Sequence, residues 1–312
     1  MEKQIVRFRA DLEALTGGAP ERLGLAVSGG PDSLALLLLA NAAYPGRIHA
    51  ATVDHGLRPE GAAEAAFVAG ICRTLAIPHA TLRAEMRETS NVQAAARTRR
   101  YALLTQWIGE IGAAFLATAH HLDDQAETLV MRLARGAGLS GLSGIRAANA
   151  AIVRPLLGWR RQELAAIVRE AGVDPVADPS NEDERFDRVR VRRRLAEAAW
   201  LEPEPLARSA GALAEANEAV EWMVERLWRE RVEATPDGHR LDPDGLPVEL
   251  QRRLVLAVLE AMGRPAPRGE AVTRLLATLG AGGSATLTEV KCAGGILWRF
   301  TPAPPRRAGR AF

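Results

Sequence analysis

A chain of 312 residues is expected to form about two domains, and its 40 Lys and Arg nearly balance its 38 Asp and Glu, for a formal net charge of +2. The longest apolar stretch, residues 34–40, is far shorter than the roughly 20 residues that span a bilayer, so neither a membrane span nor a signal peptide is expected. Only Cys72 and Cys292 occur, in no metal-binding spacing, which excludes a disulfide framework and a structural zinc or iron–sulfur site and fits the reducing cytoplasm.

Strand and helix patterns alternate over the first half of the chain. Apolar runs predict strands over 22–28, 47–54, 79–84 and 115–119, and helical patterns cover 2–16, 32–43, 60–75, 92–110 and 123–135. This alternation predicts an α/β fold with a doubly wound parallel sheet. Ligands of such sheets bind at the carboxyl ends of the strands.

A glycine-rich turn, SGGPDS, joins the first predicted strand to the next helix. Gly29 and Gly30 can adopt positive φ and turn backbone N–H groups toward a ligand, and Pro31 favours the start of a helix whose N-terminus attracts anions. Ser28 and Ser33 add hydroxyl donors. The turn lacks the lysine of a Walker loop, so it suits pyrophosphate as a leaving group. The alternative is an ordinary strand-to-helix turn.

Two further polar clusters follow predicted strands. Asp54 and His55 follow the second strand, and His120 and His121 follow a later one, so all belong on the same rim as the glycine turn. His55 lies between a strand end and a glycine and is expected to touch substrate. His120 and His121 are adjacent, so they point differently and cannot both face one ligand. A lone histidine is more often structural than catalytic.

The helix after His121 opens with three carboxylates, Asp123, Asp124 and Glu127. Spacings of four and three residues place Asp123 and Asp124 on the same face as Glu127. Like charges so placed repel each other, so a bound cation is expected, either Mg²⁺ or a substrate ammonium. The alternative is that the two aspartates only cap the helix N-terminus and interact with its dipole. This alternative is weaker for Glu127, because Glu127 lies further into the helix.

Arginine supplies 38 of the 40 basic residues, and its placement is uneven. Six lie within ten residues: Arg185, Arg188, Arg190, Arg192, Arg193 and Arg194. Such a run repels itself unless something anionic lies against it, and guanidinium groups bind phosphate bidentately, so contact with nucleic acid is predicted. The alternative is a solvated helix face, with partners in Glu182, Asp183, Glu184 and Asp187.

Two other segments carry weaker signals. Residues 135–144 hold four glycines, which suits a mobile lid or a slack connector. Arg97, Arg99 and Arg100 lie on the predicted helix 92–110 and either reach a phosphate from the sheet edge or are solvated charges.

The C-terminal part is expected to be mostly helical. Helices are predicted over about 205–234, 247–262 and 268–279, and short strands over 284–290 and 295–300. Residues 302–312, PAPPRRAGRAF, are expected to form a disordered basic tail.

Six segments together resemble the tRNA(Ile)-lysidine synthetases, a family of N-type ATP pyrophosphatases. They are SGGPDS, VDHGLRPE, NVQAAARTRRY, HHLDDQAET, RPLLGWRRQEL and DPSNEDERFDRVRVRRRL. SGGxDS marks only the wider PP-loop class, shared with tRNA thiolases and GMP synthetase, whereas the last segment is much narrower. The resemblance is strong over about residues 20–196, although Gly61 stands where serine is expected. It implies an adenine nucleotide alpha hydrolase-like catalytic domain over 1–200 and a tRNA-binding domain over 203–301.

The resemblance also implies a reaction, ligation of free lysine to C2 of the wobble cytidine of an isoleucine tRNA with a CAU anticodon. The cytidine O2 attacks the α-phosphate of ATP and pyrophosphate leaves. The lysine ε-amine then attacks C2 and expels AMP, which gives lysidine. ATP and Mg²⁺ are the implied cofactors.

Site roles are implied by position. The SGGPDS turn, Asp54, His55 and His120 would bind ATP, Asp32 would hold Mg²⁺ on its phosphates, and Arg97 would steady a phosphate or the adenylated base.

The remaining implied roles belong to the second step and to the tRNA. Asp124 and Glu127 would bind Mg²⁺ or the lysine ammonium, and one of them would accept the amine proton. The arginine run 185–194 would hold the tRNA backbone.

Two other functions stay open. One is a tRNA thiolase of the same fold, although its usual paired cysteines are absent. The other is a non-catalytic nucleotide-binding or RNA-binding protein, against which the presence of Asp32, Asp124 and Glu127 argues. The sequence also leaves a homodimer open.

Overall fold

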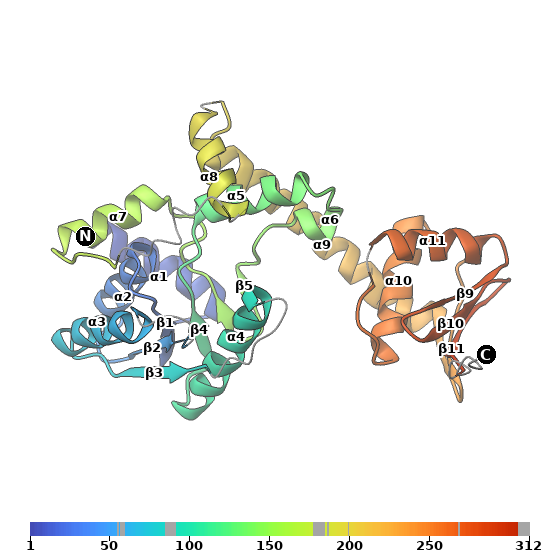
Figure 1. The fold of residues 1–312 in the computed structure, drawn as a ribbon, viewed down its shortest axis with the longest axis horizontal. Helices are drawn as coiled ribbons and strands as arrows, with labels where there is room; N and C mark the ends of the chain where they lie inside the picture. The colour runs from blue at the N-terminus through green and yellow to red at the C-terminus, as the bar shows by residue number, and fades with distance from the viewer. Residues whose placement is uncertain are drawn as a thin grey trace, which may run out of the picture. The chain divides into compact units, whose positions relative to one another are not determined.

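The computed structural model describes residues 1–54, 56, 60–84, 92–176, 185, 187–198, 200–267 and 269–304, with side chains from 61 and from 96 in the helices that begin at 60 and 92. The chain divides into two compact units, Met1–Ala214 and Glu215–Phe312 (Figure 1). No helix in the described part of the chain is long and apolar enough to cross a membrane.

The first unit is built on a six-stranded sheet with the strand order β3-β2-β1-β4-β6-β5. The strands are β1 (Leu23–Ala26), β2 (Ile48–Asp54), β3 (His79–Arg83), β4 (Phe115–Ala117), β5 (Ala148–Asn149) and β6 (Ile152–Val153). All pairs are parallel except β5 with β6 at one edge. The predicted α/β fold with a parallel sheet is therefore confirmed, and the short β5–β6 hairpin is an addition that the sequence pattern did not indicate.

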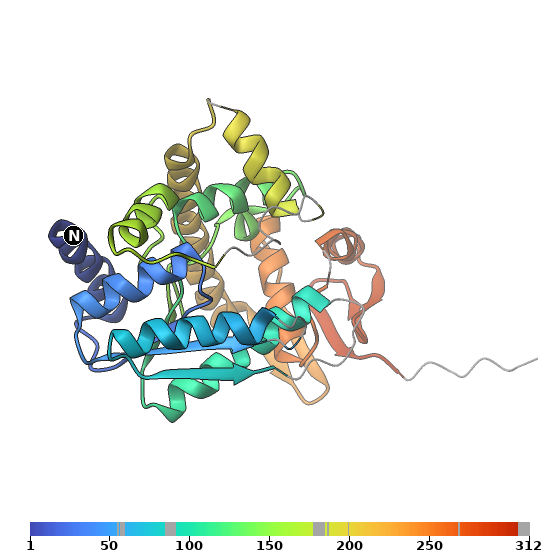
Figure 2. The same ribbon diagram turned by 60° about the vertical axis from the view of Figure 1, so that its left-hand side comes forward.

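Helices cover both faces of this sheet. They are α1 (Glu2–Thr16), α2 (Pro31–Ala43), α3 (Glu60–Thr74), α4 (Val92–Glu110), α5 (Leu122–Leu133), α6 (Leu139–Leu142), α7 (Arg161–Glu170) and α8 (Asp187–Glu197). Side chains of α1, α2, α3 and α7 share one core cluster, whereas those of α4 form another against the opposite face. Figure 2 shows α2 and α3 side by side along the sheet.

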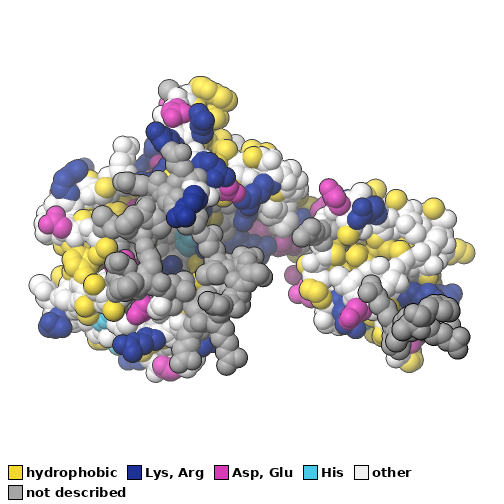
Figure 3. Space-filling model, in the orientation of Figure 1, with side chains coloured by type: hydrophobic (Ala, Val, Ile, Leu, Met, Phe, Trp, Pro, Cys, Tyr) yellow, Lys and Arg dark blue, Asp and Glu magenta, His cyan; other side chains and the backbone are white. Residues whose placement is uncertain are grey.

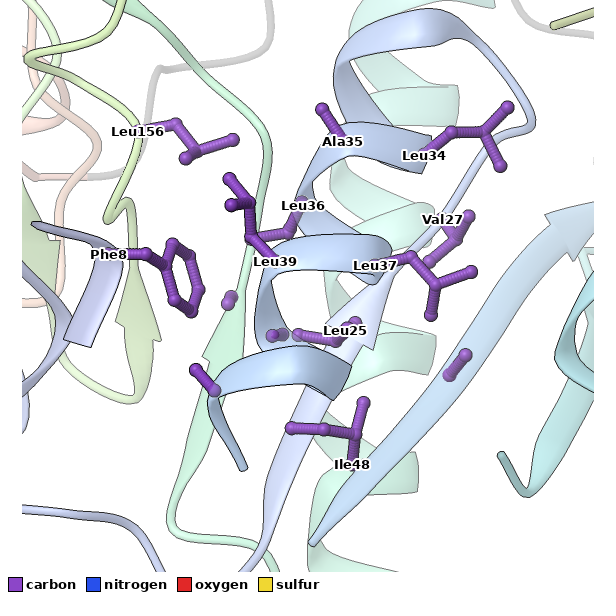
Figure 4. Close-up of a cluster of buried hydrophobic side chains, with 14 of the residues drawn as sticks. Phe8, Leu25, Val27, Leu34, Ala35, Leu36, Leu37, Leu39, Ile48 and Leu156 are labelled. Carbon is purple, nitrogen blue, oxygen red and sulfur yellow. The ribbon is translucent and has the colours of Figure 1, made fainter. Parts of the chain in front are cut away.

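The core of this unit is centred on α2. That helix is apolar on nearly every face, which is typical of a helix buried between a sheet and other helices. Figure 4 shows its leucines packed between β1 and neighbouring elements: Leu34, Leu36, Leu37 and Leu39 of α2, with Phe8, Leu25 and Leu156. Because β1 and α2 are both anchored in the core, the turn between them is held at the carboxyl edge of the sheet.

The second unit contains a five-stranded antiparallel sheet, so the prediction of a mostly helical C-terminal domain is wrong. Its strand order is β7-β8-β11-β10-β9. The strands are β7 (Val232–Thr235), β8 (Gly238–Leu241), β9 (Ser284–Leu287), β10 (Val290–Ala293) and β11 (Trp298–Pro302), and the helices are α9 (Pro203–Arg231), which crosses from the first unit, α10 (Val248–Ala261) and α11 (Gly269–Gly280).

Two tight hairpins explain this error. The loop between β9 and β10 consists of Thr288 and Glu289, with φ of 45° and 61°. Two-residue hairpin loops usually need positive φ at both positions, and Asn-Gly is their common signal, so Thr-Glu gave no sign of a turn. The β7–β8 hairpin begins at Val232, inside the predicted helix 205–234, because α9 ends at Arg231. Pro302 belongs to β11, and residues 305–312 of the predicted tail lie outside the described residues.

The glycine-rich segment 135–144 is tied to α5 by side-chain hydrogen bonds. Gln125 donates to the carbonyl of Ile145 over 2.8 Å and accepts from its N–H over 2.6 Å. Arg132 donates to the carbonyl of Gly144 over 3.0 Å. These bonds hold the C-terminal end of the segment against α5.

Candidate active site

The turn between β1 and α2 forms an N–H-rich cradle. Gly29 has φ of 86°, whereas Gly30 is extended with φ of −73°, so only Gly29 uses the positive φ that both glycines can adopt. Ser33 Oγ accepts from the N–H of Ser28 over 3.1 Å and donates to the carbonyl of Gly30 over 2.9 Å. No side chain caps the N-terminus of α2. Its free N–H groups and helix dipole therefore offer an anion site.

Gly29→Ala is expected to weaken both the fold and the cradle. A Cβ at Gly29 would lie 3.2 Å from Val176 and 3.3 Å from Val68, at a backbone conformation that costs an L-residue about 1–2 kcal/mol. Gly30→Ala is the matched control, because a Cβ there meets only Ser28 Oγ, at 3.7 Å. Denaturant unfolding of both variants checks the effect on the fold, and equal losses of stability in the two would contradict it. ATP titration of Gly29→Ala checks the effect on the cradle.

A cavity of about 540 Å³ lies in front of the cradle, at the carboxyl ends of β1 and β4. Of the predicted site residues, the following line it: Ser28, Gly30, Pro31, Asp32, Ser33, His120, Asp124, Arg188 and Arg192. The sheet edge thus gathers side chains far apart in the sequence, as the strand-end rule predicts.

His121 occupies a central place that sequence reasoning missed. It is buried and caps the N-terminus of α5. Its Nδ1 accepts from the N–H of Asp124 over 3.3 Å, and the Asp124 carboxylate accepts from the N–H of His121 over 3.0 Å. Its Nε2 lies 3.5 Å from Asp32 Oδ2 and 3.6 Å from Asp124 Oδ2. The three-residue spacing of His121 and Asp124 is that of a capping box, and it is the signal that could have identified this role.

Charges around His121 shift the pKa of two groups. Burial by itself lowers the pKa of His121, but contact with Asp32 and the charge of Asp124 outweigh burial and raise it. Burial by itself raises the pKa of Asp124, but His121 and Arg188 outweigh it and lower that pKa. The site therefore keeps Asp124 ionised beside an imidazole that readily takes a proton.

Asp123 lies 3.7 Å from His121 Nδ1 but makes its hydrogen bonds with α7 and the residue before it. Its carboxylate accepts from Arg160 over 3.2 Å and from the N–H of Arg161 over 2.8 Å, at the start of α7. These hydrogen bonds join α5 to α7, and the guanidinium of Arg161 also lies 3.9 Å from Glu127 Oε1.

Glu127 is 2% exposed and is held by arginines of α8. Arg192 Nε donates to its Oε1 over 2.7 Å, and Arg188 Nε lies 3.3 Å from its Oε2. Arg188 also donates to Thr128 Oγ1 over 3.0 Å and lies 3.9 Å from Asp124 Oδ1. The compensating cations in this structure are thus guanidinium groups, which turn two arginines of the run toward the cavity.

The other arginines of the run face outward. Arg190 pairs with Asp187, and Arg194 pairs with Glu197 over 3.2 Å. Arg193 lies 3.9 Å from Glu197, and Arg185 is exposed. Helical periodicity therefore divides the run into an inward pair and an outward set. Of the acidic partners expected for the run, Glu182, Asp183 and Glu184 lie outside the described residues.

Asp54 ends β2 and shapes the following turn. Its Oδ1 accepts from the N–H of Gly56 over 2.9 Å. A Cβ at Gly61 would lie 2.7 Å from the same oxygen, so glycine at this position leaves room for the Asp54 carboxylate. Asp54 does not line the described cavity, and His55 lies outside the described residues.

Two arginines of α4 differ in their surroundings. Arg97, predicted to steady a phosphate, is exposed, with its guanidinium 5.2 Å from the ring centre of Tyr101. Arg100 lines the cavity instead, and burial lowers its pKa. The two residues are about one helical turn apart, and the sequence alone did not show which of them faces the cavity.

Comparison with known proteins gives the family. A model of the PP-loop domain matches residues 2–199. The tRNA(Ile)-lysidine synthase of Novosphingobium aromaticivorans is 50% identical over 97% of this chain and 95% of its own length. That of Zymomonas mobilis is 44% identical over 92% of this chain and 90% of its own. The chain belongs to the tRNA(Ile)-lysidine synthase family.

Solved structures support the same fold. The U34-tRNA thiolase NcsA from Methanococcus maripaludis, solved with its [4Fe-4S] cluster, matches with a TM-score of 0.57 and 18% identity, over 69% of this chain and 80% of that one. This similarity shows the PP-loop fold alone. The cradle, α5 and α8 of this lysidine synthase family member all lie within the matched PP-loop domain.

The surroundings of His120 in this family member lower its pKa. Burial lowers the pKa of His120 to about 4, helped by the charges of Arg154, Arg97 and Arg188 and opposed by Asp124. Its Nδ1 lies 3.0 Å from Thr118 Oγ1.

We therefore expect the free energy of unfolding to fall as the pH falls from about 6.5 to about 4. The reason is that the His120 imidazole takes up its proton at a higher pH in the unfolded chain than in the folded protein. The loss amounts to at most about 3 kcal/mol. Urea unfolding at pH 7 and pH 4.5 measures it, and the pH dependence should shrink in His120→Asn. An unchanged dependence in that variant would assign the effect to other groups.

Proposed function

We propose that the chain catalyses the ATP-dependent joining of lysine to C2 of the wobble cytidine of the CAU-anticodon tRNA(Ile), through an adenylated tRNA. The observation that carries this proposal is one cavity that joins an uncapped N–H cradle to the carboxylates of Asp32 and Asp124. The first feature suits a departing pyrophosphate, and the second suits a cation or an amine.

In the first step, the cytidine O2 attacks the α-phosphorus of ATP and the bond to the β-phosphate oxygen breaks. Negative charge grows on pyrophosphate, and preorganised N–H groups stabilise such charge strongly. The free N–H groups of α2 lie where the cradle would hold it. Arg100 and Arg192, which also line the cavity, add positive charge.

The site also fits Mg²⁺. Asp32 Oδ1 is buried and makes no hydrogen bond to any described residue. Mg²⁺ is usually held by one or two carboxylates together with substrate phosphates, so Asp32 and Asp124 would be its protein ligands. When bound, the ion would neutralise charge on the phosphates.

In the second step, the lysine ε-amine attacks C2, the C2–O2 bond breaks, and AMP leaves. Only the neutral amine is nucleophilic, so a carboxylate has to hold the ammonium and accept its proton. We propose Glu127 for this role. Arg192 now occupies its carboxylate, so lysine binding would exchange one cation for another.

The outward arginines would position the tRNA. Figure 3 shows Lys and Arg side chains gathered around α8 on this face of the molecule. Arg193 and Arg194 are 67% and 84% exposed, and both lie within ion-pair distance of Glu197. Contacts of this kind fix the position of a phosphate backbone without reading its sequence.

The test is incorporation of radiolabelled lysine into RNA. Purified protein is incubated with ATP, Mg²⁺, labelled lysine and an isoleucine tRNA with a CAU anticodon, and label is counted in acid-insoluble RNA. Label that disappears when the wobble cytidine is replaced supports the proposal. Pyrophosphate release on tRNA without any label would overturn the choice of lysine and favour the thiolase alternative.

A further inference from the structure

The imidazole of His121 lies against the active site without lining its cavity. The side chain is 1% exposed, and His121 is not among the described residues that form the cavity wall. Asp32 and Asp124 do line the cavity, so a ligand there meets their carboxylates. Any effect of His121 on the reaction therefore has to pass through these two aspartates.

The two nitrogens of the His121 ring face different groups. Nδ1 accepts the backbone N–H of Asp124 over 3.3 Å, so the ring hydrogen is on Nε2. Nε2 lies 3.5 Å from Asp32 Oδ2 and 3.6 Å from Asp124 Oδ2. One edge of the ring thus caps α5, and the other edge lies between carboxylates that come from two different helices.

Both aspartates turn the same oxygen toward His121. Their Oδ2 atoms lie near Nε2, whereas Asp124 Oδ1 lies 3.9 Å from Arg188. Asp32 Oδ1 and His121 Nε2 are both buried and make no hydrogen bond to any described residue. A buried polar atom without such a partner often marks a place where an ion, a water molecule or a substrate binds. Asp32 therefore presents Oδ1 to a ligand while Oδ2 stays beside His121.

Two carboxylates supply only part of a Mg²⁺ coordination shell. No group of three or more His, Cys, Asp or Glu side chains in the described part of the chain is arranged to hold a metal ion. Mg²⁺ commonly takes one or two carboxylates and completes its octahedral shell with phosphates and water. The spacing of the two aspartates, and the oxygen that each presents, therefore decide how well the ion binds together with ATP.

We propose that His121 is a positioning residue, which holds the carboxylates of Asp32 and Asp124 at the spacing that binds Mg²⁺ together with ATP. This inference rests on the proposed function, which assigns the ion to these two aspartates. Groups that contact metal ligands orient them, and replacing such a group typically weakens metal binding by about 10–100-fold. The nitrogen that caps α5 has a different, structural role, so substitution can separate the two roles of the ring.

His121→Asn keeps the cap and removes the positioning group. Asparagine is among the best residues for capping a helix N-terminus, so α5 should still begin at Leu122, but its shorter side chain does not reach the position of Nε2. His121→Gln is the conservative variant, because its terminal N–H can approach that position. His121→Ser, which can also cap a helix, replaces His121→Asn if that variant does not fold.

Asp123→Asn is the matched control. Its carboxylate lies 3.7 Å from Nδ1, on the capping edge of the ring rather than beside Nε2. The substitution therefore changes the charge around His121 without touching the contacts that carry the inference.

The measurement is the affinity for ATP, determined by calorimetry in excess Mg²⁺ and in EDTA. The ratio of the two affinities reports the coupling between the ion and the nucleotide on the protein. We expect this ratio to fall by about 10-fold in His121→Asn, with the affinity in EDTA unchanged. His121→Gln should recover part of the ratio, and Asp123→Asn should keep all of it.

An unchanged ratio in His121→Asn would overturn the inference. So would equal losses of affinity in Mg²⁺ and in EDTA, because His121 would then only support the fold of the site. A wild-type ratio of one would overturn it as well, since the protein would then hold no ion with ATP. These titrations use neither tRNA nor lysine, so failure of lysine incorporation would separately refute the proposed function.

Discussion

Replacing Glu127 with glutamine is expected to lower lysine incorporation by at least about 100-fold while release of pyrophosphate continues. Glutamine keeps the shape of the side chain but cannot accept the amine proton or balance the charge of a bound ammonium. The carboxylate is 2% exposed and already binds a cation, the Arg192 guanidinium, over 2.7 Å. The expected defect therefore lies in the second step, with adenylated tRNA accumulating.

Single-turnover assays separate the two steps. Pyrophosphate from γ-labelled ATP reports adenylation, and labelled lysine in RNA reports transfer. Asp123→Asn is the control, because Asp123 lies on the same helix but binds Arg160 and the N–H of Arg161. It should lower stability without separating the steps. Equal losses of both products in Glu127→Gln would place Glu127 in the first step and contradict our assignment.

Asp32→Asn is expected to lower pyrophosphate release by about 10²–10³, so that lysine incorporation disappears with it. Asp32 lies at the start of α2, lines the cavity, and has a buried oxygen without a hydrogen-bond partner among the described residues. Losing its charge removes the carboxylate best placed to hold Mg²⁺ on the phosphates. Asp32→Asn is therefore expected to impair adenylation, whereas Glu127→Gln is expected to impair lysine transfer.

A second measurement makes this prediction specific. Contact with Asp32 is one cause of the raised pKa of His121, so Asp32→Asn should lower that pKa, as followed by NMR titration. Asp123→Asn again serves as the activity control. An Asp32→Asn protein with full pyrophosphate release, or with an unchanged His121 pKa, would show that Asp32 does not act at this site.

Some of the site followed from local sequence alone. The SGGPDS turn, the apolar helix after it and the strand-end clusters are local patterns, and the parallel sheet brought the turn and His120 to one cavity as expected, whereas Asp54 does not line it. His121 was missed because adjacency in sequence says that two side chains diverge, but not that His121 lies beside Asp32 and Asp124 while His120 lines the cavity. Its partner Asp32 lies on another helix, 89 residues earlier in the chain.

The arginine run shows the same limit. Its density predicted an anionic partner, and for Arg188 and Arg192 the partner in this structure is the buried carboxylate of Glu127. That pairing depends on α8 packing against α5, which no local pattern encodes. The hairpin loop at Thr288 and Glu289 was likewise invisible, because positive φ at these residues is imposed by pairing of β9 with β10.

The sequence by itself determined the α/β class, the cradle and the family resemblance, because these depend on residue types at fixed short spacing. Only the tertiary structure decided which carboxylates face the cavity, which arginines neutralise them, and that the C-terminal unit is built on an antiparallel sheet. The physical reason is that hydrogen bonds and ion pairs between distant residues depend on how elements pack, and packing is set by the whole core.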